Sequence, residues 1–254
     1  MSRVLYVVAI AAALLTSAWA AENAQQIVDE AQRRVTTKSE RYEGLLESFN
    51  ASGKKTSEKR WTFLRIGAHG QSKSIIRFTA PAEVRGVALL IVNRADRASD
   101  QWMWTPALAR DRRIALQDRS TRFFGTDFSF EDLEEREAAQ YTHELLGEEP
   151  VGGAAAWKIE AVPKPTRSSQ YAKQHVWIRK DNYAIVRIDS FVKEQVVRQL
   201  EMSDVRQVGG IWTAHDTMMT DHQRRTRTRL RLDKVEYNLP MNDDDFTVQA
   251  LRRQ

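Results

Sequence analysis

The chain has 254 residues, of which 42% are hydrophobic, and a formal net charge of +5. It contains no cysteine, which excludes disulfides, thiol catalysis, thiolate metal sites and acylation at an N-terminal cysteine. This length can bury a sizeable core without disulfides, and the mild positive charge fits either contact with anionic headgroups or a merely solubilising surface.

The N-terminus has the three parts of a secretory signal peptide. Arg3 supplies a basic region, residues 4–15 form an apolar run, and a small-x-small pattern ends at Ala20. A membrane span needs about 20 apolar residues, so the run is too short for an anchor. We predict cleavage after Ala20, which leaves residues 21–254 as one exported domain in the periplasm. Nucleic acid is therefore not an expected partner.

Hydrophobic periodicity predicts one helix followed by strands. Residues 23–35 place apolar side chains on one helical face, and alternation with period two begins near Lys59. A corner is expected between Pro81 and Gly86. The strands expected in this half cover residues 61–66, 74–78, 87–92, 101–104 and 110–116.

An insertion interrupts the strands after residue 123. Ser129 and Asp132 have capping-box spacing, which predicts a short acidic helix that ends near Ala138. A terminal turn should then hold Phe246 and Leu251. The strands expected between insertion and terminal turn cover residues 154–161, 173–179, 184–188, 195–205, 211–219 and 225–235. Many short strands with few helices indicate an α+β, mainly antiparallel β fold.

The usual catalytic motifs are missing. The chain has no HExxH, GxSxG or glycine-rich phosphate loop. Two pairs, His215 with Asp216 and Asp221 with His222, could approach across a turn, but they lack the spacing of a metal site. We predict no enzyme activity, no metal and no cofactor.

Aromatic residues alternate along the predicted strands. Trp61 shares one strand face with Phe63, and Trp102 shares one with Trp104. Such side chains can fill a core, or they can line an apolar pocket in a barrel that is large enough for a ligand. The residues predicted to line such a pocket are Trp61, Phe63, Leu89, Trp102, Trp104 and Trp177.

The last long strand carries an arginine row, Arg225, Arg227, Arg229 and Arg231, at alternate positions. One interpretation is a solvated outer face, of the kind that protects an edge strand from aggregation. The other is a strip that contacts phosphates or a partner. The sequence leaves both interpretations open.

Three segments in this order resemble one family. They are Phe78 to Leu90 (FTAPAEVRGVALL), Gln101 to Ala107 (QWMWTPA) with the following RRI at residues 112–114, and Phe123 to Asp132 (FFGTDFSFED). Together they resemble the outer-membrane lipoprotein-sorting protein family. The members of this family are relatives of the periplasmic carrier of the Lol pathway and are similar to a treponemal lipoprotein domain. The motif positions in this sequence are Pro106, Arg112, Arg113, Phe124, Gly125, Asp127 and Asp132.

The resemblance implies a half-open β-barrel whose concave face is covered by the N-terminal helix and the inserted helix. It also implies a monomeric periplasmic carrier that binds the acyl chains of a lipid or lipoprotein and moves it between inner and outer membrane, with an inner-membrane lipid transporter as a candidate partner. The alternative is a non-enzymatic accessory subunit that docks onto an envelope transporter. An open apolar groove would favour carriage, and a solid aromatic core would favour docking.

The motif residues have structural interpretations as well. Gly125 would permit a tight backbone turn, Asp127 would cap a helix, and the two arginines would pair with Asp127 or Asp132. The arginine that latches helix to barrel in the well-studied carrier has no motif counterpart in this sequence.

Overall fold

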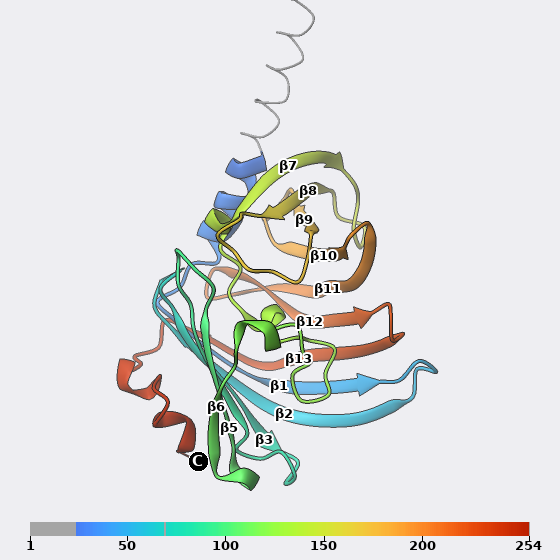
Figure 1. Cartoon of the computed structure of the whole chain (residues 1–254). Helices are drawn as coiled ribbons and strands as arrows, with labels where there is room; N and C mark the ends of the chain where they lie inside the picture. Colours follow the sequence, from blue (N-terminus) through green and yellow to red (C-terminus); the bar gives the residue numbers. More distant parts are fainter. Residues whose placement is uncertain (1–23, 69, 254) are drawn as a thin grey trace, which may run out of the picture.

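The computed structural model describes residues 24–68 and 70–253, so the predicted signal peptide lies outside the described residues. All strands described belong to one 13-stranded antiparallel sheet, which curves into an open half-barrel (Figure 1). The predicted fold class is confirmed. The strands are β1 Ser39–Phe49, β2 Lys55–Ile66, β3 Lys73–Ala80, β4 Ala88–Val92, β5 Asp100–Thr105, β6 Arg110–Arg113, β7 Tyr141–Glu148, β8 Ala156–Pro163, β9 Lys173–Arg179, β10 Ile185–Val192, β11 Gln195–Val208, β12 Ile211–Asp221 and β13 Thr226–Tyr237.

The strand order explains why an insertion covers the concave face. The order is β6-β5-β4-β3-β2-β1-β13-β12-β11-β10-β9-β8-β7, so β6 and β7 are the two edges of the sheet. These edges are also consecutive along the chain. The connection between them, residues 114–140, therefore has to cross from one edge of the half-barrel to the other, and it lies across the hollow side (Figure 1).

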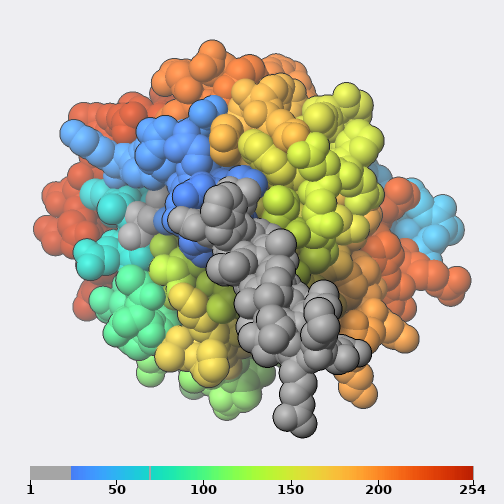
Figure 2. Space-filling view, turned by 90° about the horizontal axis from the view of Figure 1, so that it is seen from above, coloured from blue at the N-terminus to red at the C-terminus, as the bar shows by residue number. Residues whose placement is uncertain are grey.

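The N-terminal helix, residues 24–34, agrees with the prediction. It packs Ala24 and Ala31 against Tyr141, Ile159 and Ile178 of the strands near the β7 edge. In the view from above, the blue helix lies beside the yellow-green segments of β7 and β8 (Figure 2).

The predicted acidic helix after Ser129 is wrong. The capping box itself forms, because the Ser129 N–H and hydroxyl both donate to Asp132 at 2.7 Å, and the Asp132 N–H donates back at 3.3 Å. Only two short 3-10 turns follow, η3 Glu131–Leu133 and η4 Ala138–Gln140. The acidic side chains of this segment bind partners in several different elements, and such tertiary contacts override local helix preference.

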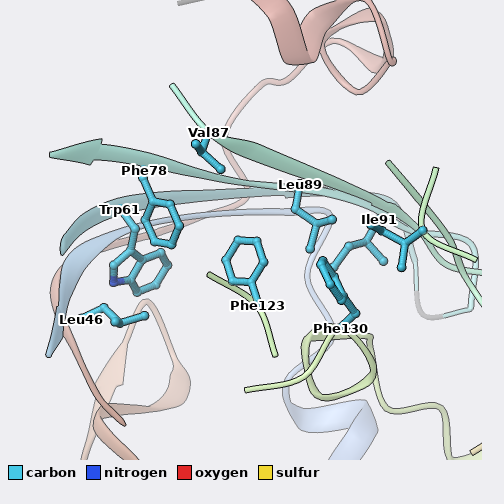
Figure 3. Packing of buried hydrophobic residues seen from close by; sticks show 9 residues of the cluster. Leu46, Trp61, Phe78, Val87, Leu89, Ile91, Phe123 and Phe130 are labelled. Carbon is cyan, nitrogen blue, oxygen red and sulfur yellow. The ribbon is translucent and has the colours of Figure 1, made fainter. Parts of the chain in front are cut away.

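The two faces of the sheet carry different cores. On the concave face, Trp61, Phe78 and Leu89 pack against Phe123 and Phe130 of the insertion (Figure 3). On the convex face, a C-terminal segment with η5 Asp243–Asp245 and η6 Ala250–Arg252 covers β4 and β5. The predicted terminal turn is confirmed, since Phe246 is 2% exposed and Leu251 is fully buried.

Candidate functional site

A cavity of about 490 Å³ lies on the concave face beneath the insertion. Its walls come from β1, β2, β3, β12 and β13, and its roof comes from residues 123–135. Ligand cavities in proteins span roughly 300–1,000 Å³, so the volume is adequate for a long apolar group. The apolar lining residues include Leu46, Trp61, Phe63, Ile76, Phe78, Phe123, Phe128, Leu133, Met202, Ile211, Trp212, Leu230 and Leu232.

One end of this cavity is polar. The Arg65 guanidinium, whose side chain is 5% exposed, donates to Glu135 of the insertion at 2.7 Å and to Glu40 of β1 at 3.4 Å. The Tyr42 hydroxyl donates to Glu40 at 2.7 Å. Burial, together with the nearby Glu40 charge, raises the pKa of Tyr42 well above its ordinary value. The phenol therefore stays a hydrogen-bond donor at neutral pH.

Buried ion pairs fasten the insertion to the rest of the molecule. Asp132 accepts from Arg198 of β11 and from the Tyr171 hydroxyl, each at 2.7 Å. Glu134 lies 2.9 Å from Arg119 within the insertion and 3.6 Å from Arg167, which follows β8, and all three side chains are at most 6% exposed. Burial raises the pKa of the Glu134 carboxyl, while Arg119 acts to lower it. Removing one partner of such a pair is costly because the other charge stays buried.

Asp127 anchors the insertion to β13 and does not cap a helix as predicted. Its carboxylate is 1% exposed and accepts from the hydroxyls of Thr226 at 2.5 Å and Thr228 at 2.7 Å. Its backbone N–H donates to the Thr228 hydroxyl at 2.9 Å. Its arginine partner is Arg122, at 2.6 Å.

The two motif arginines have partners other than those predicted. Arg112 lies 3.8 Å from Asp118, and Arg113 lies 2.6 Å from Asp100. Both guanidinium side chains are at least half exposed. The prediction that they pair with Asp127 or Asp132 is therefore wrong, because Arg122 and Arg198 occupy those places.

The remaining motif residues shape turns. Gly125 has a φ of +74°, and a Cβ there would meet nothing within 4 Å, so the backbone angle rather than crowding calls for glycine. Phe124, also at positive φ, packs edge-on against Phe78. Pro106 begins the 3-10 turn η1 Pro106–Leu108 that ends β5. These positions support the insertion and the strand ends.

Of the six residues predicted to line a pocket, Trp61 and Phe63 line the cavity. Leu89 is on the same face but fully buried in the core. Trp102 and Trp104 pack with the C-terminal segment on the convex face, so their predicted place is wrong. The reason is the alternation of β5, which turns Met103 to the concave side instead.

Trp177 is also wrongly placed by the prediction. It is 1% exposed, packs with Ala156 and Val186, and lies between the side chains of Lys158 at 4.9 Å and Arg187 at 4.5 Å.

The cavity residues on β13 were not predicted from the sequence. The alternation along the strand could have identified them, because Leu230 and Leu232 alternate with the arginine row and therefore face the opposite side of the sheet.

Arg227, Arg229 and Arg231 of the arginine row face the convex side, opposite Leu230 and Leu232, whereas Arg225 lies in the turn before β13. The edge-strand interpretation is wrong, because β13 is paired with β1 on one side and with β12 on the other. Arg229 binds Asp216 through both carboxylate oxygens, and Arg231 lies 3.7 Å from Glu47. The row is thus an outer face with partial pairing.

A second cavity of about 300 Å³ lies beneath the N-terminal helix. Most of its lining is apolar, and the lining residues come from the helix, the insertion, β9 to β12 and the turn between β9 and β10. It shares five lining residues with the first cavity, so the two spaces adjoin. The shared residues are Val35, Glu135, Met202, Trp212 and Ala214.

The sheet is split beside this junction. Strand β12 pairs with β13 only where Asp216–Asp221 lies opposite Thr226–Arg231. No pairing joins Ile211–His215 to Leu232–Tyr237, although both stretches lie in the described chain. We call this gap the β12–β13 split. One hydrogen bond of 2.6 Å, between the hydroxyls of Thr213 and Tyr237, bridges it.

Irregularities in both neighbouring strand pairs account for the split. In β13, Lys234 lies opposite Glu43 and Leu232 opposite Gly44, so Asp233 is an extra, bulged residue. In β11, Asp204 has a φ of +50° where its pairing with β12 is interrupted. A bulge bends its strand and increases the twist, and both irregularities lie where the β12–β13 ladder ends.

The described residues offer no sign of a metal centre or a spanning helix. Within residues 24–68 and 70–253, no group of three or more His, Asp or Glu side chains is placed to hold a metal ion. In the same part of the chain, no helix has the length and apolar character needed to cross a membrane.

Comparison with known proteins gives one family and one fold. A family model described as an uncharacterized protein matches residues 70–253. The structure of a putative outer membrane lipoprotein-sorting protein domain from Vibrio parahaemolyticus is 26% identical with a TM-score of 0.85, covering 92% of this chain and 100% of that one. A DUF1329 family protein from Desulfovibrio piger is 25% identical with a TM-score of 0.86, covering 91% and 99%.

A LolA superfamily protein from Nitrosomonas europaea is 18% identical with a TM-score of 0.69, covering 89% of this chain and 98% of that one. At this identity the similarity concerns the fold. No curated protein matches the sequence.

Proposed function

Because the chain belongs to the family whose model matches residues 70–253 and is similar to a putative outer membrane lipoprotein-sorting protein domain, we propose that it is a non-enzymatic carrier. It binds the acyl chains of a lipid or lipoprotein on its concave face and moves this cargo between the inner and outer membranes. The signal-like residues 1–20 would direct residues 21–254 to the periplasm as one domain. An inner-membrane lipid transporter is the expected source of the cargo.

The observation that carries this proposal is the cavity. The concave face could have been closed by a solid aromatic core, yet it holds a space of about 490 Å³ with mainly apolar walls. Burial of an acyl chain stabilises it by about 0.8 kcal/mol per methylene. A carrier has to match that gain with an apolar site of its own, and this cavity supplies one.

The insertion supports release as well as binding. Its roof over the cavity combines apolar contacts with ion pairs to Arg65 and Arg198, which lie on two different strands. A ligand can shift such a roof between closed and open states only through its different affinity for the two states. Cargo transfer would then follow movement of the insertion rather than a change in the sheet.

The first test is native mass spectrometry of the mature protein, purified from the periplasm without detergent. We expect a stoichiometric lipid or acylated peptide adduct, identified after extraction. Protein that is empty and that also refuses added phospholipid, fatty acid and lipopeptide would overturn the carrier proposal and favour the docking subunit.

A matched pair of variants on β13 locates the binding. Leu230→Gln places an amide in the cavity wall, whereas Arg227→Gln makes the same new side chain on the exposed convex face. We expect Leu230→Gln to weaken binding of a fluorescent fatty acid about tenfold, because a buried amide without a partner costs about 1–3 kcal/mol. Arg227→Gln should bind as the unmodified protein does. Equal affinities in both variants would place the ligand elsewhere.

A further inference from the structure

The two cavities adjoin, and we treat them as two arms that meet at a branch point, which is the place where they share lining residues. The larger arm runs beneath the insertion and the smaller arm beneath the N-terminal helix, with volumes of about 490 and 300 Å³. Met202, Trp212 and Ala214 of β11 and β12 line both arms, as do Val35 and Glu135. The branch point therefore lies over the middle of β11 and the first residues of β12.

The walls of both arms are mainly apolar. The larger arm is lined by Trp61, Phe78 and Leu230. The smaller arm has Val28 and Ala31 of the helix on one side and Ile178 of β9 on the other. Apolar walls of this kind bind hydrocarbon and provide few partners for polar groups.

Polar groups collect at the branch point instead. Glu135, one of the shared residues, accepts from the Arg65 guanidinium at 2.7 Å and from the Ser72 hydroxyl at 2.7 Å. The β12–β13 split opens beside the same place. Trp212 lines both arms and is nevertheless 38% exposed, so the branch point reaches solvent at this residue.

We propose that the cargo has two acyl chains on one polar group, with one chain in each arm and the polar linkage at the branch point beside Trp212. This inference rests on the proposed carrier function and names its ligand class. A single linear chain that enters at the branch point fills one arm and leaves the other without a partner. A two-chain lipid fills both arms and keeps its polar group at the split.

Palmitate and a dipalmitoyl phospholipid are the probes that test this. Native mass spectrometry should show two palmitates, but only one dipalmitoyl lipid, on each protein. The variant Val28→Phe adds a ring to the wall of the smaller arm. We expect it to hold one palmitate and to bind the dipalmitoyl lipid at least tenfold more weakly.

Gln26→Phe is the matched control, because Gln26 lies on the exposed face of the same helix. It should bind both probes as the unmodified protein does. Circular dichroism of each variant would establish that the helix is retained. Leu230→Phe, which narrows the larger arm, should also reduce the palmitate count from two to one.

Two results would overturn the two-chain proposal while leaving the carrier proposal standing. One is binding of a single palmitate at saturation. The other is unchanged affinity of Val28→Phe for the dipalmitoyl lipid. Failure to bind any acyl probe would overturn both proposals, so the two failures are distinguishable.

Discussion

Gly44 lies where β1 comes nearest to β13, and a Cβ on this residue would be 2.1 Å from the carbonyl oxygen of Arg231. The obstacle is backbone, which cannot swing away as a flexible side chain can. Local sequence pattern cannot detect such an approach between two backbones.

A similar limit applies to Trp102 and Trp104. Their alternation correctly predicts that they share one face of the strand. It does not reveal that this face packs against the C-terminal segment, which is far away in the chain, rather than lining the cavity.

Gly44→Ala should destabilise the fold by about 1–3 kcal/mol, because overpacking forces the backbone of β1 or β13 to shift. Urea unfolding monitored by tryptophan fluorescence would measure this. The neighbouring Glu43→Ala is the control, since it removes a partly exposed ion pair worth at most about 1 kcal/mol. Equal midpoints for the two variants would contradict the close approach.

Asp127→Asn tests the anchor of the insertion on β13. The change keeps the shape of the side chain but removes the charge that faces Arg122, Thr226 and Thr228. We expect a loss of about 3 kcal/mol in the free energy of unfolding, as for other broken buried pairs. Asp233→Asn, which breaks an exposed pair with Arg60, should cost less than about 1 kcal/mol. A similar loss in both would mean that burial of Asp127 is unimportant.

The insertion and β7 show what is missed when elements are assigned from local pattern. The local pattern of residues 131–137 predicts a helix, yet each carboxylate there has a partner in another part of the fold. In β7, Tyr141, His143 and Leu145 alternate with the exposed Thr142, Glu144 and Leu146. The strand exists because β8 pairs with it and the N-terminal helix packs on it.

His143 makes the docking of the N-terminal helix pH-dependent. Its Nδ1 lies 2.9 Å from the Gln25 side-chain oxygen. Burial lowers the pKa of His143 to about 4, with Arg136 and Lys164 contributing. Because His143 has a pKa near 6.5 in the unfolded state, the stability that its buried neutral form contributes is fully present above pH 6.5. It is lost as the pH falls toward 4, by an amount on the order of 3 kcal/mol.

We therefore expect His143→Gln to lose less stability than the unmodified protein between pH 7 and pH 4.5, as measured by urea unfolding at both pH values. His222→Gln serves as the control because His222 is exposed, and it should keep the full pH dependence. If the stabilities of the His143 and His222 variants change equally with pH, the contact of His143 with the helix is not the source of the pH dependence.

The C-terminal segment is an element whose loss should affect stability but not carriage. Leu251 is fully buried against β4 on the convex face. Leu251→Ala should cost about 2–5 kcal/mol and leave the affinity for fatty acid unchanged, because the sheet separates it from the cavity. Calorimetry and a fatty-acid titration of the same variant would measure the two quantities. A parallel drop in affinity would show that the two faces are coupled.

At the scale of the whole molecule, the order of strands determines where function can lie. The chain starts in the middle of the sheet, builds one half to the edge at β6, crosses the hollow, and returns from β7. Alternation and turn residues predict most of the strands and their antiparallel pairing. The crossing and the β12–β13 split could not, because both depend on which distant strands meet.

The split gives the whole-molecule arrangement a measurable consequence. In the free protein, amides of Ile211–His215 and Leu232–Tyr237 that face the split have no partner strand opposite them, whereas Asp216–Asp221 and Thr226–Arg231 are paired. Backbone amides without such partners exchange with solvent through smaller opening free energies. Hydrogen exchange should therefore be fast in the first two stretches and slow in the other two. Loading with the dipalmitoyl lipid should slow exchange at the split and leave the paired part unchanged, because the polar linkage would cover Trp212 there. Uniform protection along β12 and β13 in the free protein would show that the sheet is closed in solution, and the cargo would then have to enter by displacement of the insertion.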